Sequence, residues 1–297
     1  MENKIVVGIP AFNEQDKIAG IILKLKKITD EIIVCDDGST DMTSEIVENL
    51  GVKLIKHKKN EGYGSAIGSL FHMAKTMNAD IFVTIDADGQ HDVNDINRLI
   101  EPILNKKADI VIGSRFLDKT NEVPTYRKIG IKTITGLTNK ISKSQIKDAQ
   151  SGFRAYNKKA VTIINPTERG MGISTEILMR ASENKLSIIE IPVIISYHGN
   201  TSTHNPIFHG TSVLMSTIKF IAIRKPLTFY GIPGLVFLFI GLIFVGWALQ
   251  LFSESGQIIT NVALIGIGCT LIGVLLLMTY SILSTIIVLF REKENNN

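Results

Sequence analysis

Residues 80–91 read DIFVTIDADGQH, and this segment decides the fold that the sequence predicts. Its first half, Asp80–Ile85, is an apolar run with the length of one buried strand. Its second half, Asp86–His91, brings two carboxylates directly after that strand. Similar short apolar runs alternate with stretches of helical periodicity along residues 4–113. This alternation predicts an α/β fold, with a mostly parallel, doubly wound sheet and helices on both faces.

The expected elements follow one another at the spacing of strand–helix–strand units. We expect strands at 4–9, 31–35, 52–55, 80–85 and 109–113, and helices at 13–28, 41–50, 62–77 and 92–104. Ligands collect at the carboxyl ends of the strands in such a sheet. Polar clusters follow four of these strands, at 10–14, 36–39, 86–91 and 113–115. We therefore expect the four clusters to converge on one edge of the sheet.

Asp86 and Asp88 are the sharpest candidates for a metal site. In extended chain, residues two apart point to the same side, and neighbouring anions raise each other's pKa unless a cation is present. Mg²⁺ or Mn²⁺ takes oxygen ligands and bridges carboxylates to phosphates. Gln90 offers a carbonyl oxygen. His91 is a weaker candidate, because a lone histidine is more often a structural hydrogen-bonding residue.

Asp36 and Asp37 form a second pair at a strand end. Their carboxylates are suited to accept hydrogen bonds from a ribose or from the edge of a base. The alternative is an Asx-type turn followed by a helix cap, in which Asp37 and Ser39 would serve the backbone. The residues of this cluster alone do not decide between the two interpretations.

Two uncharged runs, Pro226–Ser253 and Gln257–Phe290, dominate the C-terminal part, whereas residues 1–225 hold 30 of the 32 Lys and Arg. Since roughly 20 apolar residues cross a bilayer as a helix, we expect two membrane spans, at about 228–252 and 258–290. A buried core hairpin is the alternative, although core helices rarely run so long without a polar face.

Basic residues flank this pair of spans. Arg224 and Lys225 precede it, Arg291 and Lys293 follow it, and the connecting turn at 253–256 has none. The positive-inside rule then places the N-terminal body and both termini in the cytoplasm. We expect a multi-pass protein of the cell membrane.

The chain is expected to have four parts. They are a catalytic body at 1–205, a juxtamembrane amphipathic helix at 206–225, the two spans within 226–290 and a tail at 291–297. Segment 127–147 has six basic residues and no acidic one, and we expect an amphipathic helix near a membrane, with a solvated surface helix as the alternative. We expect no nucleic-acid partner. Gly266, Gly268 and Gly273 would allow close helix contacts, and so a homo-oligomer.

Five motifs, in their order and spacing, resemble those of family 2 glycosyltransferases with the GT-A fold. They are Pro10–Glu14, Asp36–Ser39, Asp86–His91, Gly113–Phe116 and Gln150–Ala155. The resemblance covers essentially the whole chain. The two C-terminal spans are similar to those of the dolichyl-phosphate mannose synthase group and its prokaryotic polyprenyl-phosphate relatives.

The resemblance implies a role for each matching residue. The catalytic residues would be Asp88, Arg115, Arg127 and Glu176, and the metal ligands Asp86, Asp88 and Gln90. The substrates would be bound by Pro10, Phe12, Glu14, Asp36, Asp37, Asp86, Ala87, Asp148, Ser151 and Arg154. One departure is the loop 197–206, which has His198 and His204 where mannose synthases of this group usually carry an arginine.

The implied reaction is inverting transfer of a single hexose from a GDP- or UDP-sugar to a polyprenyl phosphate, dolichyl or undecaprenyl, with Mg²⁺ or Mn²⁺. The sequence lacks the Gln-x-x-Arg-Trp motif of processive synthases. One alternative is transfer to a hydroxyl of another membrane lipid or lipid-linked glycan, which needs a general base, either Asp148 or Glu176. The other is a catalytically silent GT-A-like membrane scaffold.

Overall fold

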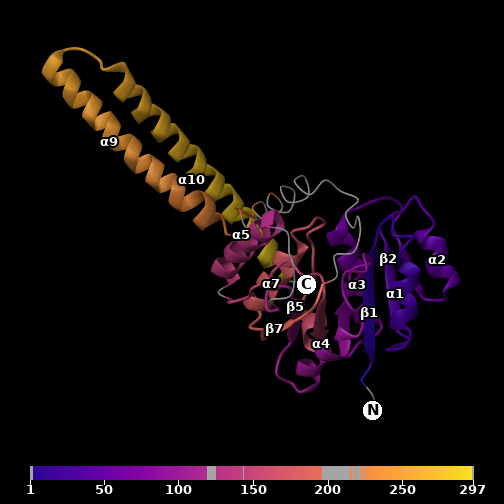
Figure 1. Ribbon diagram of the computed structural model, residues 1–297. Coiled ribbons are helices and arrows are strands. Elements are labelled where there is room, and N and C mark those ends of the chain that lie inside the picture. Colours follow the sequence, from indigo (N-terminus) through magenta and orange to yellow (C-terminus); the bar gives the residue numbers. More distant parts are fainter. Residues whose placement is uncertain are drawn as a thin grey trace. The chain divides into compact units, whose positions relative to one another are not determined.

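A computed structural model describes residues 3–118, 125–142, 144–195, 215, 218, 222–223 and 225–295, without the side chains of 125–127, 141 and 290–295. The chain divides into two compact units, Met1–Thr217 and Ile218–Asn297. Figure 1 shows the elements of both units. The predicted helix 206–225 and the histidines of the loop 197–206 fall outside the described residues, apart from a few isolated positions in the helix.

The first unit is built on a seven-stranded sheet with the order β3-β2-β1-β4-β6-β5-β7. Its strands are β1 (Ile5–Ala11), β2 (Ile32–Asp36), β3 (Lys53–Lys56), β4 (Ile81–Thr84), β5 (Ile110–Ser114), β6 (Arg154–Asn157) and β7 (Ile188–Pro192). All neighbouring pairs are parallel except those of β6, which runs antiparallel to both β4 and β5. The predicted mostly parallel sheet is therefore confirmed.

Helices cover both faces of this sheet. One face carries α1 (Ile18–Leu25), α2 (Thr43–Asn49) and α4 (Asp95–Leu104), and the other carries α3 (Tyr63–Thr76), α6 (Lys158–Ile163) and α7 (Ile173–Glu183). In α4 the buried residues Ile96, Leu99, Ile100 and Ile103 recur at helical spacing, and this apolar stripe fixes the face turned to the sheet.

A further helix, α5 (Thr125–Ser142), packs against α7. Its buried face includes Thr138, whose hydroxyl lies 3.4 Å from that of Thr175. Lys128, Ile129 and Lys132 are exposed. The helix ends five residues before the predicted limit at 147, and its contact with a membrane stays a prediction.

Two local expectations were wrong. The helix predicted from Asn13 begins only at Ile18, because Asn13 has a positive φ of 55° and its backbone turns toward the loop after β2. The chain after β4 is also not extended, since Ala87 and Asp88 lie in a turn that continues into Gly89 at φ 72°. Glycine tolerates this left-handed conformation, which most side chains avoid.

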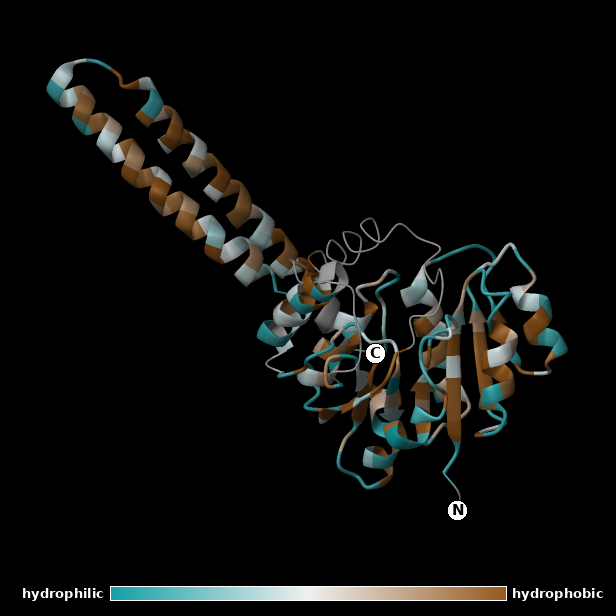
Figure 2. Ribbon diagram, in the orientation of Figure 1, coloured by the Kyte–Doolittle hydropathy of each residue, from teal (hydrophilic) through white to brown (hydrophobic). Residues whose placement is uncertain are grey.

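The second unit contains a π-helical turn, η1 (Leu227–Gly231), followed by α9 (Ile232–Ser255) and α10 (Thr260–Asn295). Both helices are apolar along almost their whole length (Figure 2). The stretches Leu227–Ser255 and Thr260–Leu289 are long and apolar enough to cross a membrane. The expected pair of apolar C-terminal helices is therefore confirmed.

Small residues allow α9 and α10 to approach closely. A Cβ added to Gly241 would overlap Thr270, and one added to Gly273 would lie 2.5 Å from the Leu238 amide nitrogen. Gly266 packs in the same way, whereas a Cβ on Gly268 would meet open space. Close glycine contacts of this kind strengthen van der Waals packing between apolar helices.

Candidate active site

The loops that follow β1 and β2 are joined by hydrogen bonds at the carboxyl edge of the sheet. The Asn13 amide donates to Ser39 Oγ at 2.8 Å, and the Thr40 amide donates to Asn13 Oδ1 at 2.9 Å. The Glu14 amide donates to Thr43 Oγ1 at 2.9 Å. The structure thus brings together the predicted clusters 10–14 and 36–39, with Pro10 buried and Phe12 and Glu14 half-buried.

Asp36 and Asp37 are both buried, but they serve different loops. Asp36 accepts hydrogen bonds from the Ser39 amide and the Ser44 hydroxyl, so it closes the turn after β2 and holds the start of α2. Asp37 accepts bonds from the Glu61 and Gly62 amides at 3.0 and 2.8 Å. In the alternative interpretation, Asp37 accepts hydrogen bonds from backbone amides. The structure shows such bonds for Asp37 and also for Asp36. Binding of substrate by either residue stays a prediction.

Asp86 lies at the centre of this edge. The Tyr63 hydroxyl donates to its Oδ1 at 2.9 Å. Burial and then the negative charge of Asp88 raise the pKa of Asp86 from 3.8 to about 6. A raised pKa means that the ionised form is poorly compensated, which is the condition that a bound cation relieves.

Asp88 extends the negative charge toward the β1 loop. The Gln90 amide donates to Asp88 Oδ1 at 3.0 Å. Burial raises the pKa of Glu14, and the charge of Asp88 raises it further against the opposing effect of Lys17. Ala87, between the two aspartates, is buried. A surplus of negative charge therefore collects where the metal was predicted.

The residues present fit a hard divalent ion only in part. Within the described residues, no group of three His, Cys, Asp or Glu side chains could hold a metal ion by itself. Asp86 and Asp88 nevertheless supply carboxylate oxygens beside an amide side chain, Gln90, and such oxygens suit Mg²⁺ or Mn²⁺. An ion held by so few protein ligands takes its other ligands from water or from substrate phosphates.

Arg115 and Asp148 form a buried ion pair. Arg115 Nε lies 2.6 Å from Asp148 Oδ2 and a terminal nitrogen lies 2.7 Å from Oδ1, a bidentate arrangement that the Arg115 amide joins at 3.1 Å. Burial of Asp148 raises its pKa, but the charge and hydrogen bonds of Arg115 outweigh burial and leave that pKa below 3.8. The two predicted site residues are thus brought into direct contact with each other.

Glu176 is fully buried in α7, and both of its carboxylate oxygens are engaged. They accept bonds from the Thr167 and Glu168 amides at 2.9 and 2.7 Å, and from Arg180 Nε at 2.8 Å. These contacts hold the segment before α7. The structure gives Glu176 no exposed surface toward a substrate, and its catalytic role stays a prediction.

Arg154 and Ser151 are also buried, and they shape the segment that leads into β6. The Arg154 guanidinium donates to the carbonyl oxygens of Ala149, Ser151 and Ser174 at 2.7, 2.8 and 3.2 Å. These three bonds are with backbone, and the guanidinium also interacts with the Tyr156 side chain. Its predicted role in binding substrate is untested. The side chain of Arg127 lies outside the described part of α5.

His91 keeps a neutral ring beside this segment. Burial and then the charge of Arg115 lower the pKa of His91 to about 4. Its ring centroid lies 4.9 Å from that of Phe153, and its Nδ1 is buried without a hydrogen-bond partner. The packing against Phe153 agrees with the structural role that the sequence favoured for this histidine.

Two residues that contact the predicted site were missed by sequence reasoning. They are His57, whose Nδ1 lies 2.7 Å from Asp37 Oδ1, and Tyr63, whose hydroxyl donates to Asp86. Gly152, inside the motif Gln150–Ala155, also lies against Asp86. The two glycines in Gly62-Tyr63-Gly64 were a usable signal, because paired glycines after a strand often mark a close approach of backbone.

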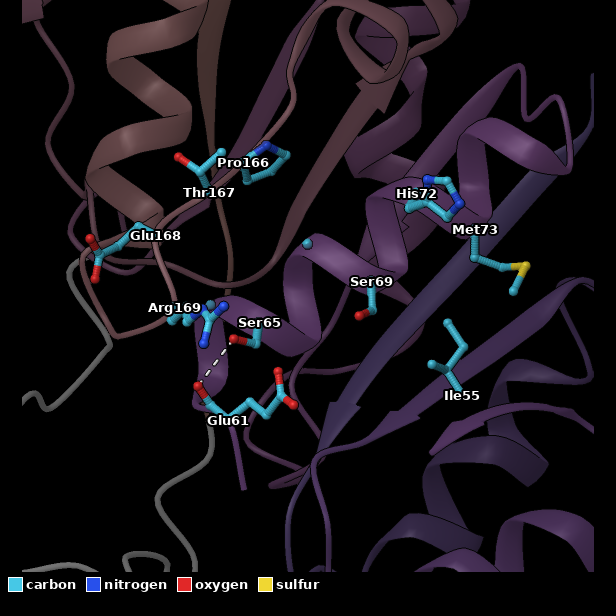
Figure 3. Close-up of a pocket in the computed structure, with 12 residues that line it drawn as sticks. Ile55, Glu61, Ser65, Ser69, His72, Met73, Pro166, Thr167, Glu168 and Arg169 are labelled. Carbon is cyan, nitrogen blue, oxygen red and sulfur yellow. Dashed lines mark hydrogen bonds between the residues drawn. The ribbon is translucent and has the colours of Figure 1, made fainter. Parts of the chain in front are cut away.

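A separate pocket of about 390 Å³ lies along α3, and none of the sequence-predicted site residues is part of its described lining. Figure 3 shows Ser65, Ser69 and His72 on one side and Pro166–Arg169 on the other. The Ser69 hydroxyl, in the lining of this pocket, lies 2.9 Å from His57 Nε2. His57 in turn contacts Asp37 through its Nδ1.

Comparison with known proteins adds independent findings. Residues 6–163 match the family described as Glycosyl transferase family 2. The chain is 33% identical over 238 residues to the UDP-N-acetylglucosamine–dolichyl-phosphate N-acetylglucosaminyltransferase of Methanococcus voltae, across 72% of this chain and 93% of that protein. It is 27% identical over 302 residues to glycosyltransferase AglJ of Haloferax volcanii, across 98% of this chain and 95% of that protein.

A solved structure shares the fold. It is the glucosyl-3-phosphoglycerate synthase of Mycobacterium tuberculosis, crystallised with Mn²⁺, uridine diphosphate and glucosyl-3-phosphoglycerate. The TM-score is 0.57 at 19% identity, over 73% of this chain and 79% of that chain. The similarity confirms the GT-A-like arrangement of sheet and helices that the sequence predicted.

Proposed function

We propose, from the premise that this chain belongs to glycosyl transferase family 2, that it transfers a single hexose from a nucleotide-diphosphate sugar to a polyprenyl phosphate at a membrane. The Methanococcus voltae relative is named for transfer to dolichyl phosphate, which supports this choice of acceptor. The two apolar helices, α9 and α10, are suited to keep the enzyme where such a lipid resides.

The observation that carries the choice of acceptor is the state of the two candidate bases. Asp148 is paired with Arg115, Glu176 is paired with Arg180, and both carboxylates are fully buried. A hydroxyl acceptor needs a general base within reach of its proton. A phosphate monoester needs none, because its second pKa of about 6 leaves it largely anionic at neutral pH. The burial of both carboxylates therefore favours a phosphate acceptor.

On the donor side, Asp86, Asp88 and Gln90 would hold Mg²⁺ or Mn²⁺ against the diphosphate of the nucleotide sugar. The bound ion would supply electrostatic stabilisation to the departing nucleoside diphosphate. The raised pKa of Asp86 supports this assignment, since burial and the charge of Asp88 outweigh the charges of Arg115 and Arg154 and disfavour its ionised form. The similar synthase from Mycobacterium tuberculosis was crystallised with Mn²⁺ and uridine diphosphate, which is consistent with it.

The remaining residues would bind the two substrates from opposite sides. The loops around Phe12 and Asp37 would receive the nucleoside, because they meet beside Asp86 at the carboxyl edge of the sheet. Arg115, oriented by its bidentate pair with Asp148, would attract the acceptor phosphate, and Arg127 would assist. A guanidinium is well suited to phosphate oxygens.

We assign the catalytic unit to the cytoplasmic side of the membrane, together with both termini. The support is the pattern of charges, since basic residues flank the two apolar helices and the turn between them has none. This pattern is typical of a hairpin whose ends remain inside.

The test uses membranes that contain the full chain, a panel of labelled UDP- and GDP-sugars, a polyprenyl phosphate and Mg²⁺ or Mn²⁺. We expect label in a lipid that mild acid hydrolyses, and loss of that label when a chelator is added. Label that resists mild acid would instead indicate a hydroxyl acceptor. Absence of both label and nucleotide binding, across all donors, would favour the scaffold.

A further inference from the structure

One short turn contacts both of the carboxylates that follow β2 and β4. The turn is Gly62-Tyr63-Gly64, at the N-terminus of α3. Its Gly62 amide donates to Asp37 Oδ2 at 2.8 Å, and its Tyr63 hydroxyl donates to Asp86 Oδ1 at 2.9 Å. The position of this turn therefore fixes the spacing between two carboxylates that are far apart in sequence.

The Asp86 carboxylate is enclosed from a second side by Gly152. A Cβ added to Gly152 would lie 2.5 Å from Asp86 Oδ2 and 2.7 Å from the Tyr63 hydroxyl. Thr84 Oγ1 donates to the Gly152 carbonyl at 2.7 Å and keeps this backbone in place. Because the hydroxyl holds one side of the carboxylate and Gly152 leaves no room on another, Asp86 has little freedom to rotate.

The turn itself is held by the backbone of the segment before α7. The Gly64 amide donates to the Arg169 carbonyl at 2.8 Å, and a Cβ on Gly64 would overlap the Glu168 carbonyl. Glu176 in turn binds the amides of Thr167 and Glu168. Figure 3 shows Glu168 and Arg169 beside the first turn of α3. Tyr63 is thus anchored at its backbone and not only by its ring.

The Tyr63 hydroxyl acts as a permanent donor in this arrangement. A phenol keeps its proton at physiological pH. The hydroxyl therefore donates to the carboxylate of Asp86, at 2.9 Å.

We propose that Tyr63 is a positioning residue for glycosyl transfer, whose hydroxyl, opposed by Gly152, orients the Asp86 carboxylate toward the metal-bound nucleotide. This inference rests on the proposed function, in which Asp86 holds the ion on the donor diphosphate. Tyr63 itself would touch neither substrate nor ion, so it acts only through Asp86.

The decisive variant is Tyr63→Phe, which removes one hydroxyl and keeps the ring. The measurement is calorimetric titration of the purified full chain, in detergent, with Mn²⁺ in the presence of UDP or GDP. We expect binding of the ion to weaken about 10-fold, as for the loss of one hydrogen bond to a charged group. The matched control is Tyr280→Phe, which makes the same change in α10 of the second unit.

A second variant tests the same carboxylate from its other side. Gly152 does not have a positive φ, so Gly152→Ala adds a methyl group against Asp86 without backbone strain. We expect a similar loss of Mn²⁺ binding, and a double variant with Tyr63→Phe that loses less than the product of the two, because both changes act on one group. This variant decides the matter if Tyr63→Phe does not fold.

Two outcomes would overturn the inference, and they are distinguishable. If the wild-type chain binds Mn²⁺ with nucleotide and Tyr63→Phe binds it equally well, or if Tyr280→Phe loses as much, Tyr63 does not position Asp86. If the wild-type chain binds neither UDP nor GDP with Mn²⁺, the proposed function fails first, and this inference fails with it.

Discussion

The carboxylates after β4 and those between β5 and the end of α7 differ in how their charge is compensated. Asp86 and Asp88 lie beside each other, and the pKa of Asp86 rises to about 6. Asp148 and Glu176 are instead paired with Arg115 and Arg180. Four predicted site residues of the same chemical type therefore belong to two classes.

This difference indicates which carboxylates can receive a ligand. Burial and the neighbouring charge of Asp88 raise the pKa of Asp86, and a bound cation would relieve the cost of its ionised form. A buried carboxylate in a bidentate ion pair already has its partner, and removal of either partner leaves an uncompensated charge. We infer that the β4 edge binds the ion and that Asp148 and Glu176 support the architecture around it.

The largest effect is expected on turnover, when a carboxylate of the first class, Asp86 or Asp88, is replaced. Asp88→Asn should lower kcat/KM on the order of 1000-fold, because it removes an electrostatic contact to the leaving group. The measurement is transfer of labelled sugar to polyprenyl phosphate in membranes, with the amount of inserted protein as the control. Near-normal transfer by this variant would show that Asp88 takes no part in the reaction.

A change of Asp148, in the second class, is expected to lower the stability of the folded protein. Asp148→Asn should lower the free energy of unfolding of the catalytic unit by about 3 kcal/mol, because it removes the fully buried charge that pairs with Arg115 in a bidentate arrangement. Asp86→Asn should leave that free energy unchanged or raise it, since it removes a repulsive charge. Urea unfolding of both variants without metal checks the contrast, and equal losses would contradict the division into two classes.

The two classes should also differ in their dependence on pH. The folded pKa of Asp86 lies above 3.8, so the folded state binds the proton more tightly and loses stability as pH rises from about 4 to 6. The folded pKa of Asp148 lies below 3.8, so its contribution is present above that pH and is lost as pH falls.

Thermal unfolding without metal should therefore show the Asp86 contribution, of about 1 kcal/mol after allowance for solvent screening, as a decline between pH 4 and 6. Asp86→Asn should remove this part of the pH dependence, and saturating Mn²⁺ should reverse it. A wild-type profile that rises through this range in parallel with that of Asp86→Asn would argue against the raised pKa.

The smallest effect is expected for Glu176. Glu176→Gln keeps the shape of the side chain and weakens the bonds to Thr167, Glu168 and Arg180. A positioning role predicts a loss of activity below about 10-fold, within the range of one weakened charged hydrogen bond. The matched control is Arg180→Gln, which should cause a similar loss. A drop in kcat of several orders of magnitude for Glu176→Gln alone would instead support the predicted catalytic role of Glu176.

The sequence predicted the first half of the fold well because its signals are local. The apolar strands β1 to β4 and the turn residues at their ends follow from short-range periodicity, and so does the convergence of Asp37 and Asp86. The late start of α1 at Ile18 was missed, since it depends on hydrogen bonds to a loop more than 20 residues away.

The site was predicted less completely because partners cannot be read from single motifs. Asp148 was predicted as a site residue from its motif, but its pairing with Arg115 joins positions 33 residues apart. The contact of Tyr63 with Asp86 depends on the packing of α3 beside β1. The contact of Gly152 with Asp86 depends on the antiparallel insertion of β6 between β4 and β5. No periodicity in the sequence predicts that β6 lies between β4 and β5.

The proposed reaction depends on one ion held by Asp86 and Asp88 on a nucleoside diphosphate. The most direct test is electron paramagnetic resonance of Mn²⁺ titrated into the purified full chain with UDP or GDP, compared with the double variant Asp86→Asn, Asp88→Asn. We predict one nucleotide-dependent Mn²⁺ signal per wild-type chain and its loss in the double variant. An unchanged signal in the double variant would place the ion elsewhere and contradict the account.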